Sequence, residues 1–179
     1  MSDYIDKSEI SIEYKFFDET HETELYLNLY GNNILAFERN NETYTTRWNL
    51  DELVFWLRNF IDNLADDPYP VAVEGEFAAE KDENAREFDS DDEAEFDSYY
   101  DMLDDWNMRH RWHTASAGAV LPDVYFQQVG EVIEISWNNN GFEDEVLFKN
   151  ISGGVRVDKE KFYSVVDLFL KEYADHWFK

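Results

Sequence analysis

Alternating apolar and polar residues near the start of the chain predict an antiparallel strand meander. Over residues 10–16 every second side chain is hydrophobic, and the same period of two returns over residues 25–29. The turn residues Gly31-Asn32-Asn33 precede an apolar run over 34–37, which we predict to be a third strand. Alternation over residues 44–48 predicts one further short strand.

A spacing of three and four residues then predicts a helix over about 50–64. Asn49 is suited to cap its start, and Glu52 occupies the reciprocal capping-box position. The helix would bury one apolar stripe, made of Leu50, Leu53, Val54, Leu57, Phe60, Ile61 and Leu64. We expect Asp66-Asp67-Pro68 to end it.

The last third of the chain has the same order of patterns. Strands are predicted over about 124–129, 131–137 and 145–148, with a turn at Asn138-Asn139-Asn140-Gly141. Gly153-Gly154 predicts another turn before a short strand over 155–157. Asp158 would then cap a long helix.

The fold class that follows is α+β. It has two similar antiparallel strand-meander-plus-helix halves (βββ(β)α), over about 8–65 and 120–178, joined by an acidic loop and a central helix. Residues 1–179 are expected to form a single compact domain, with an acidic insertion over about 66–118 and a divergent internal duplication as its origin.

The insertion is predicted to begin as an exposed loop. Residues 68 to about 92 contain two prolines, a glycine and many acids. A helix is expected to begin near Asp92 and to end at Ala115-Ser116-Ala117-Gly118. Its apolar face would carry Phe96, Tyr99, Leu103, Trp106, His110 and His113.

The composition indicates a folded chain and narrows its chemistry. Hydrophobic residues make up 44% of the 179 positions, with six Trp, eleven Tyr and fourteen Phe to fill a core. The absence of cysteine excludes disulfides, a thiolate nucleophile and a cysteine-based zinc site. The acidic first residues do not form a signal peptide, and no apolar stretch approaches about 18 residues, so we expect a soluble cytoplasmic protein.

Charge is the strongest indication of function. The chain has 41 acidic and 15 basic side chains, a net charge of -26. Residues 66–105 hold seventeen of the acids and only two bases, Lys81 and Arg86. Such a field repels nucleic acid and anionic membranes and attracts basic proteins. Acids with aromatic residues between them suit a protein interface, and a line of carboxylates can imitate the phosphates of nucleic acid.

The candidate partner-binding residues are therefore the acids and aromatics of the insertion. They are Glu74, Glu76, Glu87, Phe88, Asp89, Asp91, Asp92, Glu93, Glu95, Phe96, Tyr99, Tyr100, Asp101, Asp104 and Asp105. The simpler alternative is that this face only keeps the protein in solution or adapts it to high salt.

His110 and His113 are the main candidates for catalysis. Their i, i+3 spacing puts both rings on one helix face, where a pair of histidines can bind metal beside carboxylates. The same face carries core residues, which favours hydrogen-bonded histidines at the core margin. Arg109 and Arg111 either anchor the acidic loop by ion pairs or form a small anion site. No EF-hand, phosphate loop or nucleophile elbow is present, and we expect no cofactor.

In size, acidity, lack of cysteine and meander-plus-helix organisation, the chain resembles bacterial immunity and inhibitor proteins, including the DNA-mimic proteins of anti-restriction and phage conflict. The segment from Pro122–Phe126 through Val132–Trp137 resembles a core sequence that recurs within a protein family. The resemblance implies a role without assigning residues to it. That role is neutralising a basic partner, such as a toxin, a nuclease or another nucleic-acid-binding protein. The expected protein is not an enzyme; the alternatives are a metal-dependent hydrolase using His110 and His113, or an acidic subunit of a larger assembly.

Overall fold

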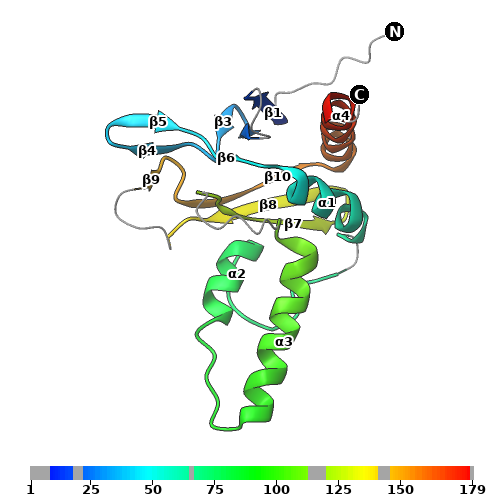
Figure 1. The fold of residues 1–179 in the computed structure, drawn as a ribbon. Coiled ribbons are helices and arrows are strands. Elements are labelled where there is room, and N and C mark those ends of the chain that lie inside the picture. The colour runs from blue at the N-terminus through cyan, green and yellow to red at the C-terminus, as the bar shows by residue number, and fades with distance from the viewer. Residues whose placement is uncertain (1–8, 18–21, 65–66, 113–119, 141–145, 178–179) are drawn as a thin grey trace.

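The computed structural model has an α+β fold, as the sequence predicts (Figure 1). It describes residues 9–17, 22–64, 67–112, 120–140 and 146–177. Within these ranges there are three antiparallel sheets and four α-helices. Two of the helices project together from the body of the molecule (Figure 1).

The first sheet is built around β2 (Thr23–Leu29). β1 (Ile10–Phe16) pairs with it along its full length, and the short strands β3 (Asn32–Asn33) and β6 (Arg47–Trp48) pair with its other edge. Every second residue of β2 is buried, as the alternation predicts. A tight turn at Tyr30-Gly31, with both φ angles positive, leads from β2 into β3.

The second sheet has β8 (Val132–Asn138) between β7 (Asp123–Val129) and β10 (Ser152–Asp158). Gly130, at φ +62, makes the tight turn between β7 and β8. The backbone of Trp112 donates to the Val124 carbonyl at 3.0 Å, so the chain before β7 pairs with that strand's outer edge.

A small third sheet corrects two sequence predictions. It joins β4 (Phe37–Arg39) to β5 (Glu42–Tyr44) and β9 (Leu147–Phe148). The prediction of a strand over 34–37 is wrong, because the apolar residues before Phe37 lie buried in a turn. The single strand expected over 44–48 is divided between β5 and β6. Asn40 and Asn41, both with positive φ, form the two-residue turn that reverses the chain between β4 and β5.

The helices that cover the core begin close to the predicted positions. In α1 (Asp51–Phe60), the Asn49 side chain accepts a hydrogen bond from the Asp51 amide at 2.8 Å, and the short 3₁₀ helix η1 (Ile61–Asn63) follows. In α4 (Lys159–Trp177), Asp158 accepts from the Lys161 amide at 3.0 Å, which confirms the predicted cap.

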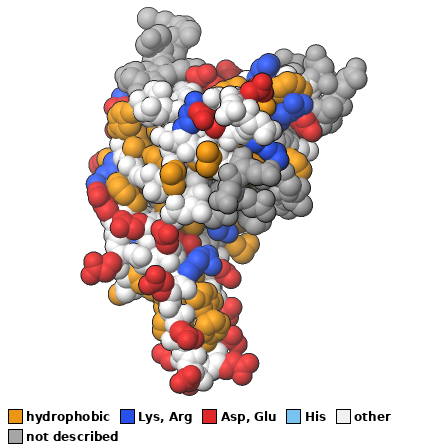
Figure 2. Space-filling view, turned by 90° about the vertical axis from the view of Figure 1, so that its left-hand side faces the viewer, with side chains coloured by type: hydrophobic (Ala, Val, Ile, Leu, Met, Phe, Trp, Pro, Cys, Tyr) orange, Lys and Arg blue, Asp and Glu red, His pale blue; other side chains and the backbone are white. Residues whose placement is uncertain are grey.

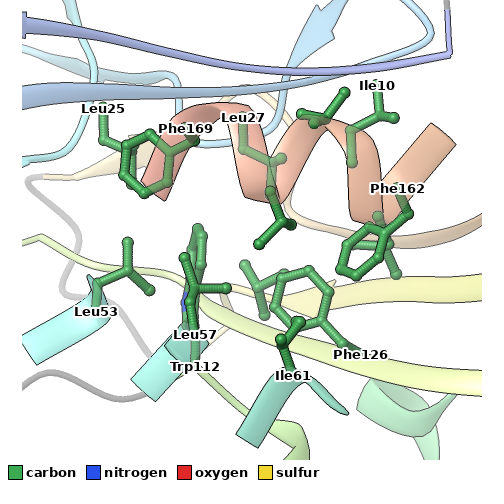
Figure 3. Packing of buried hydrophobic residues seen from close by; sticks show 14 of the residues in the cluster. Ile10, Leu25, Leu27, Leu53, Leu57, Ile61, Trp112, Phe126, Phe162 and Phe169 are labelled. Carbon is green, nitrogen blue, oxygen red and sulfur yellow. The ribbon is translucent and has the colours of Figure 1, made fainter. Parts of the chain in front are cut away.

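The main core lies between the first sheet, α1, α4 and the second sheet. Figure 3 shows Ile10, Leu25 and Leu27 of the first sheet on one side and Leu57 of α1 and Phe126 of β7 on the other. Phe162 and Phe169 of α4 complete this cluster, which therefore unites side chains from both ends of the sequence.

Three further expectations are wrong in detail. Gly153-Gly154 is not a turn but part of β10. The stretch read as loop contains a helix, α2 (Ala78–Ala85). The central helix, α3 (Glu93–His110), begins as expected but ends at His110, because the next two residues are extended along β7. Residues 115–118, where we expected its end, lie outside the described residues.

The internal duplication stays a prediction. Each half holds a strand meander followed by a helix, but the partners on the second edge of β2 are two residues long, whereas β10 has seven. In addition, β9 pairs with β4 of the first half rather than with a strand of its own half.

Candidate functional site

The two projecting helices and the connection between them form a distinct acidic element. We call residues 78–110, which comprise α2, α3 and their connection, the arm (Figure 1). It carries thirteen carboxylates against three basic side chains, Lys81, Arg86 and Arg109. The base of the arm rests on the second sheet, and the connection together with the start of α3 forms its far end (Figure 1).

Small residues seat α2 against the second sheet. Ala78 and Ala79 are buried, and the Ala79 amide donates to the hydroxyl of Ser136 on β8 at 3.0 Å. Just before the helix, the ring of Phe77 lies directly on Gly154 of β10. A side chain at Gly154 would overlap that ring, which explains a glycine inside a strand.

The carboxylate of Asp82 binds α2 to its surroundings. Only 4% of this residue is exposed. The Asn107 amide of α3 donates to it at 2.8 Å, the Tyr125 hydroxyl of β7 at 3.0 Å and the Arg86 guanidinium at 2.9 Å. The Tyr69 hydroxyl, from the segment before α2, lies at 3.4 Å. These donors compensate the burial of a charge and hold both helices to the sheet.

The same cluster keeps two phenols protonated. Burial, and then the negative charge of Asp82, raise the pKa of Tyr69 and of Tyr125. The sequence alone does not single out this cluster, because Asp82 is one acid among many. The available signal was the small-residue spacing that puts Ala78, Ala79, Asp82 and Ala85 on one helical face.

His110 anchors the other helix of the arm. It is 0% exposed and stacks on Trp106 with ring centroids 4.1 Å apart. Its Nδ1 lies 2.8 Å from the Phe126 carbonyl and its Nε2 lies 2.9 Å from Asp67 Oδ2. Burial alone would raise the pKa of Asp67, but hydrogen bonds from His110 and Arg109 outweigh it and lower that pKa. Both ring nitrogens are thus engaged in holding the fold.

The two arginines form ion pairs, as expected, but their partners lie outside the acidic loop that we expected them to anchor. Arg109 contacts Asp67, in the segment before the arm, at 2.9 Å and Asp105 at 2.6 Å, while Arg111 lies 3.5 Å from Asp123. His113 lies outside the described residues. Within the described ranges, no group of three or more His, Asp or Glu side chains is arranged to hold a metal ion.

The four candidate aromatics form one cluster on the arm. Phe88 stacks on Tyr99 with centroids 3.9 Å apart, Tyr99 meets Tyr100 edge to face at 5.5 Å, and Phe96 lies 4.7 Å from Tyr100. The Tyr99 hydroxyl donates to the Ala85 carbonyl, and the Tyr100 hydroxyl lies 3.1 Å from the carbonyls of both Arg86 and Phe88. These contacts fasten the connection to α3, so the phenols have a structural role as well.

Most candidate acids of the arm are exposed. The exposed ones are Glu87, Asp89, Asp91, Asp92, Glu93, Glu95, Asp101, Asp104 and Asp105. Asp92 caps α3 by accepting from the amides of Ala94 and Glu95. In the described part of the chain, no basic side chain forms an ion pair with Asp89, Asp91 or Glu93. Figure 2 shows acidic side chains at the end of the arm and around a hydrophobic group on its side.

Three of these carboxylates, together with Asp97, make a stripe along α3. Glu93, Asp97, Asp101 and Asp105 follow one another at four-residue spacing, and all are exposed. Successive members are about 6 Å apart along the helix axis. Asp97 was not among our candidates, although the four-residue spacing was readable in the sequence.

Glu74 and Glu76 are not part of this surface. The Glu74 carbonyl accepts from Asn84, and the Glu76 carboxylate lies 3.3 Å from Arg156 of β10. Both residues are exposed and lie in the segment before the arm, where Glu74 contacts α2 and Glu76 contacts β10.

Comparison of the chain with protein-family models, curated proteins and solved structures finds no match. In the described part of the chain, no helix is long and apolar enough to cross a membrane. The exposed charge of the arm is therefore the feature that points to a function.

Proposed function

We propose that the protein is a non-enzymatic binding protein whose acidic arm neutralises a basic protein partner. The partner would be a toxin, a nuclease or another nucleic-acid-binding protein, as in bacterial or phage conflict. The observation that carries the proposal is the concentration of exposed carboxylates on a projecting, internally braced element.

The rigidity of the arm supports binding rather than mere solubility. A solubilising face needs no bracing, whereas this arm is fixed at its base by Asp82 and His110 and along its length by stacked aromatics. Charges held in place before association lose little conformational entropy on binding. Such charges also steer a basic partner toward the site and speed association.

The stripe on α3 supports a partner that binds nucleic acid. Glu93 and Asp105, the first and last carboxylates of the stripe, are about 18 Å apart along the axis of α3, so the stripe presents a line of negative charge on the helix surface. A protein whose cleft is adapted to a phosphate backbone offers basic side chains along a comparable line. The cytoplasmic location expected from the sequence belongs to the same proposal, since such a partner acts where nucleic acid is found.

The test is a charge reversal that leaves the arm folded. Asp92 caps α3, so the triple variant D89K/D91K/E93K changes neighbouring acids and keeps the cap. The matched control, E160K/D167K/D175K, alters total charge equally on exposed positions of α4. Both are compared with the native chain in capturing basic proteins from the source organism.

The expected result is that the native chain and the α4 control retain the same basic protein, and that the arm variant loses it by at least tenfold. The captured protein should bind or cleave nucleic acid, and the native chain should block that activity. Equal loss in both triple variants would mean that total charge, not the arm, drives capture, and would contradict the proposal.

A further inference from the structure

The aromatic cluster on the arm lies among carboxylates, and this combination has a specific chemistry. Phe96 and Tyr100 are neighbours on α3, one turn apart, with ring centroids 4.7 Å from each other. Glu93 precedes Phe96 by three positions and Asp97 precedes Tyr100 by three, so these carboxylates flank the two rings. Phe96 is 37% exposed.

At two places in this chain, an arginine side chain lies over an aromatic ring and also forms an ion pair with a carboxylate. The guanidinium carbon of Arg47 lies 3.9 Å from the centre of the Phe17 ring, while the same side chain pairs with Glu22 at 2.7 Å. Arg156 lies 5.0 Å from the Phe77 ring and pairs with Glu134 at 2.8 Å. In both places the ring takes one face of the guanidinium and the carboxylate takes its N–H groups.

The arm offers the same pair of groups without a guanidinium. No described lysine or arginine lies over the rings of Phe88, Phe96, Tyr99 or Tyr100; the one arginine nearby in sequence, Arg86, turns to Asp82. The tyrosine hydroxyls are already occupied by carbonyls of the arm. What remains for a partner is therefore ring surface and carboxylate oxygen.

We propose that Phe96 and Tyr100, with Glu93 and Asp97, form a site for an arginine side chain of the partner. This inference rests on the proposed function and names the residue type that the arm recognises. A guanidinium is planar, weakly hydrated and able to stack on a ring while its edge binds carboxylate, whereas an ammonium is compact and strongly hydrated. The partner's contact segment is accordingly rich in arginine rather than lysine.

The experiment compares two peptides of equal charge. A twelve-residue peptide alternating arginine and serine, and the same peptide with lysine for arginine, are each titrated into the full chain at 150 mM salt. The arginine peptide should bind roughly five- to tenfold more tightly, since stacking adds to the ionic attraction. Equal affinities would overturn the inference.

A variant separates ring stacking from the bidentate pairing that arginine makes with any carboxylate. Phe96→Leu keeps an apolar residue on an exposed helix face and removes only the ring. The Phe96 amide donates to the Asp92 carbonyl through the backbone, which the substitution leaves in place. The preference for arginine should fall to about twofold, with lysine-peptide affinity unchanged. The matched control is Phe55→Leu on α1, which is also exposed and lies outside the arm; it should keep the full preference. A preference that survives Phe96→Leu, or that Phe55→Leu reduces equally, would overturn the inference.

These outcomes are distinct from failure of the proposed function. If both peptides bind equally and D89K/D91K/E93K weakens both, the acidic arm binds basic partners but does not select arginine. If neither peptide responds to the arm charges, the binding surface lies elsewhere and both proposals are wrong.

Discussion

The Tyr125 hydroxyl of β7 donates a 3.0 Å hydrogen bond to the Asp82 carboxylate of α2. This buried contact ties the acidic arm to the middle of the chain's hydrophobic body, 43 residues away in sequence. It shows how a highly charged element can be held rigid: one of its own acids is turned inward and surrounded by donors, while the others face solvent.

Replacing that acid should destabilise the protein. In Asp82→Asn, the N–H groups of the new amide would face the side chains that now donate to the carboxylate. Several hydrogen bonds to a buried charge are then lost, which should lower the free energy of unfolding by about 2–4 kcal/mol. Urea unfolding followed by tryptophan fluorescence measures this. The exposed Glu87→Gln is the control, with a change within about 0.5 kcal/mol. Similar values for the two variants would contradict the role assigned to Asp82.

The strand and helix periods in the sequence were sufficient to predict much of this fold. Apolar alternation placed β1, β2, β7 and β8, and the apolar stripes placed α1 and α4, because burial on one face leaves a regular trace. The third sheet left a weaker trace: the strand predicted over 145–148 contains β9, but the pairing of the three strands was not predicted. Its strands are two or three residues long, and the pairing of β4 with β9 is a contact between distant segments.

The candidate site could be predicted in part. Charge density located the arm, because exposed acids need no tertiary partner to be recognised. The α2 helix escaped notice because its buried stripe consists of alanines and one aspartate, which carry little hydrophobic signal. The sequence also did not reveal that Tyr99 and Tyr100 brace the arm, since their partners are backbone carbonyls.

Alkaline pH should act on Tyr125 only after the protein opens. Burial and then Asp82 raise its pKa in the folded state, so the stability it contributes is complete below about pH 10 and is lost as pH rises through the folded pKa. After a jump to pH 11.5, absorbance at 295 nm should show a fast phase from accessible phenols and a slow phase on unfolding. Tyr125→Phe should remove amplitude from the slow phase alone; a loss from the fast phase would show that this phenol is accessible.

Low pH should reduce the contribution of Asp67 to the free energy of unfolding. Its folded pKa lies below the ordinary value of 3.8, because the hydrogen bonds from His110 and Arg109 outweigh burial. Its stabilisation is therefore complete above about pH 4 and is lost as the pH falls through the folded pKa. We expect Asp67→Asn to cost about 1 kcal/mol at pH 7 and less near pH 3, since the contribution falls as the pH drops through the folded pKa. Urea unfolding of both proteins at the two pH values gives the difference. A cost that does not change with pH would mean that the charge of Asp67 is unimportant.

The close approach of Phe77 to Gly154 predicts a coupled pair. Gly154→Ala forces the new methyl group against the ring and should lower the free energy of unfolding by about 1–3 kcal/mol. In a Phe77→Ala background the same change should cost much less, because the ring is gone. Thermal or urea unfolding of the four proteins in this cycle measures the coupling. Additive effects would show that the ring does not restrict position 154.

The most direct test of the central claim is to map where a basic ligand binds. In an NMR titration of the ¹⁵N-labelled full chain with the arginine–serine peptide at 150 mM salt, the largest amide shifts should fall on the connection and on the exposed face of α3, around Asp89, Glu93, Phe96 and Asp97. The first sheet and α4 should change little. Shifts centred on the body of the molecule, or spread evenly over all its acidic surface, would contradict the assignment of the arm as the binding site.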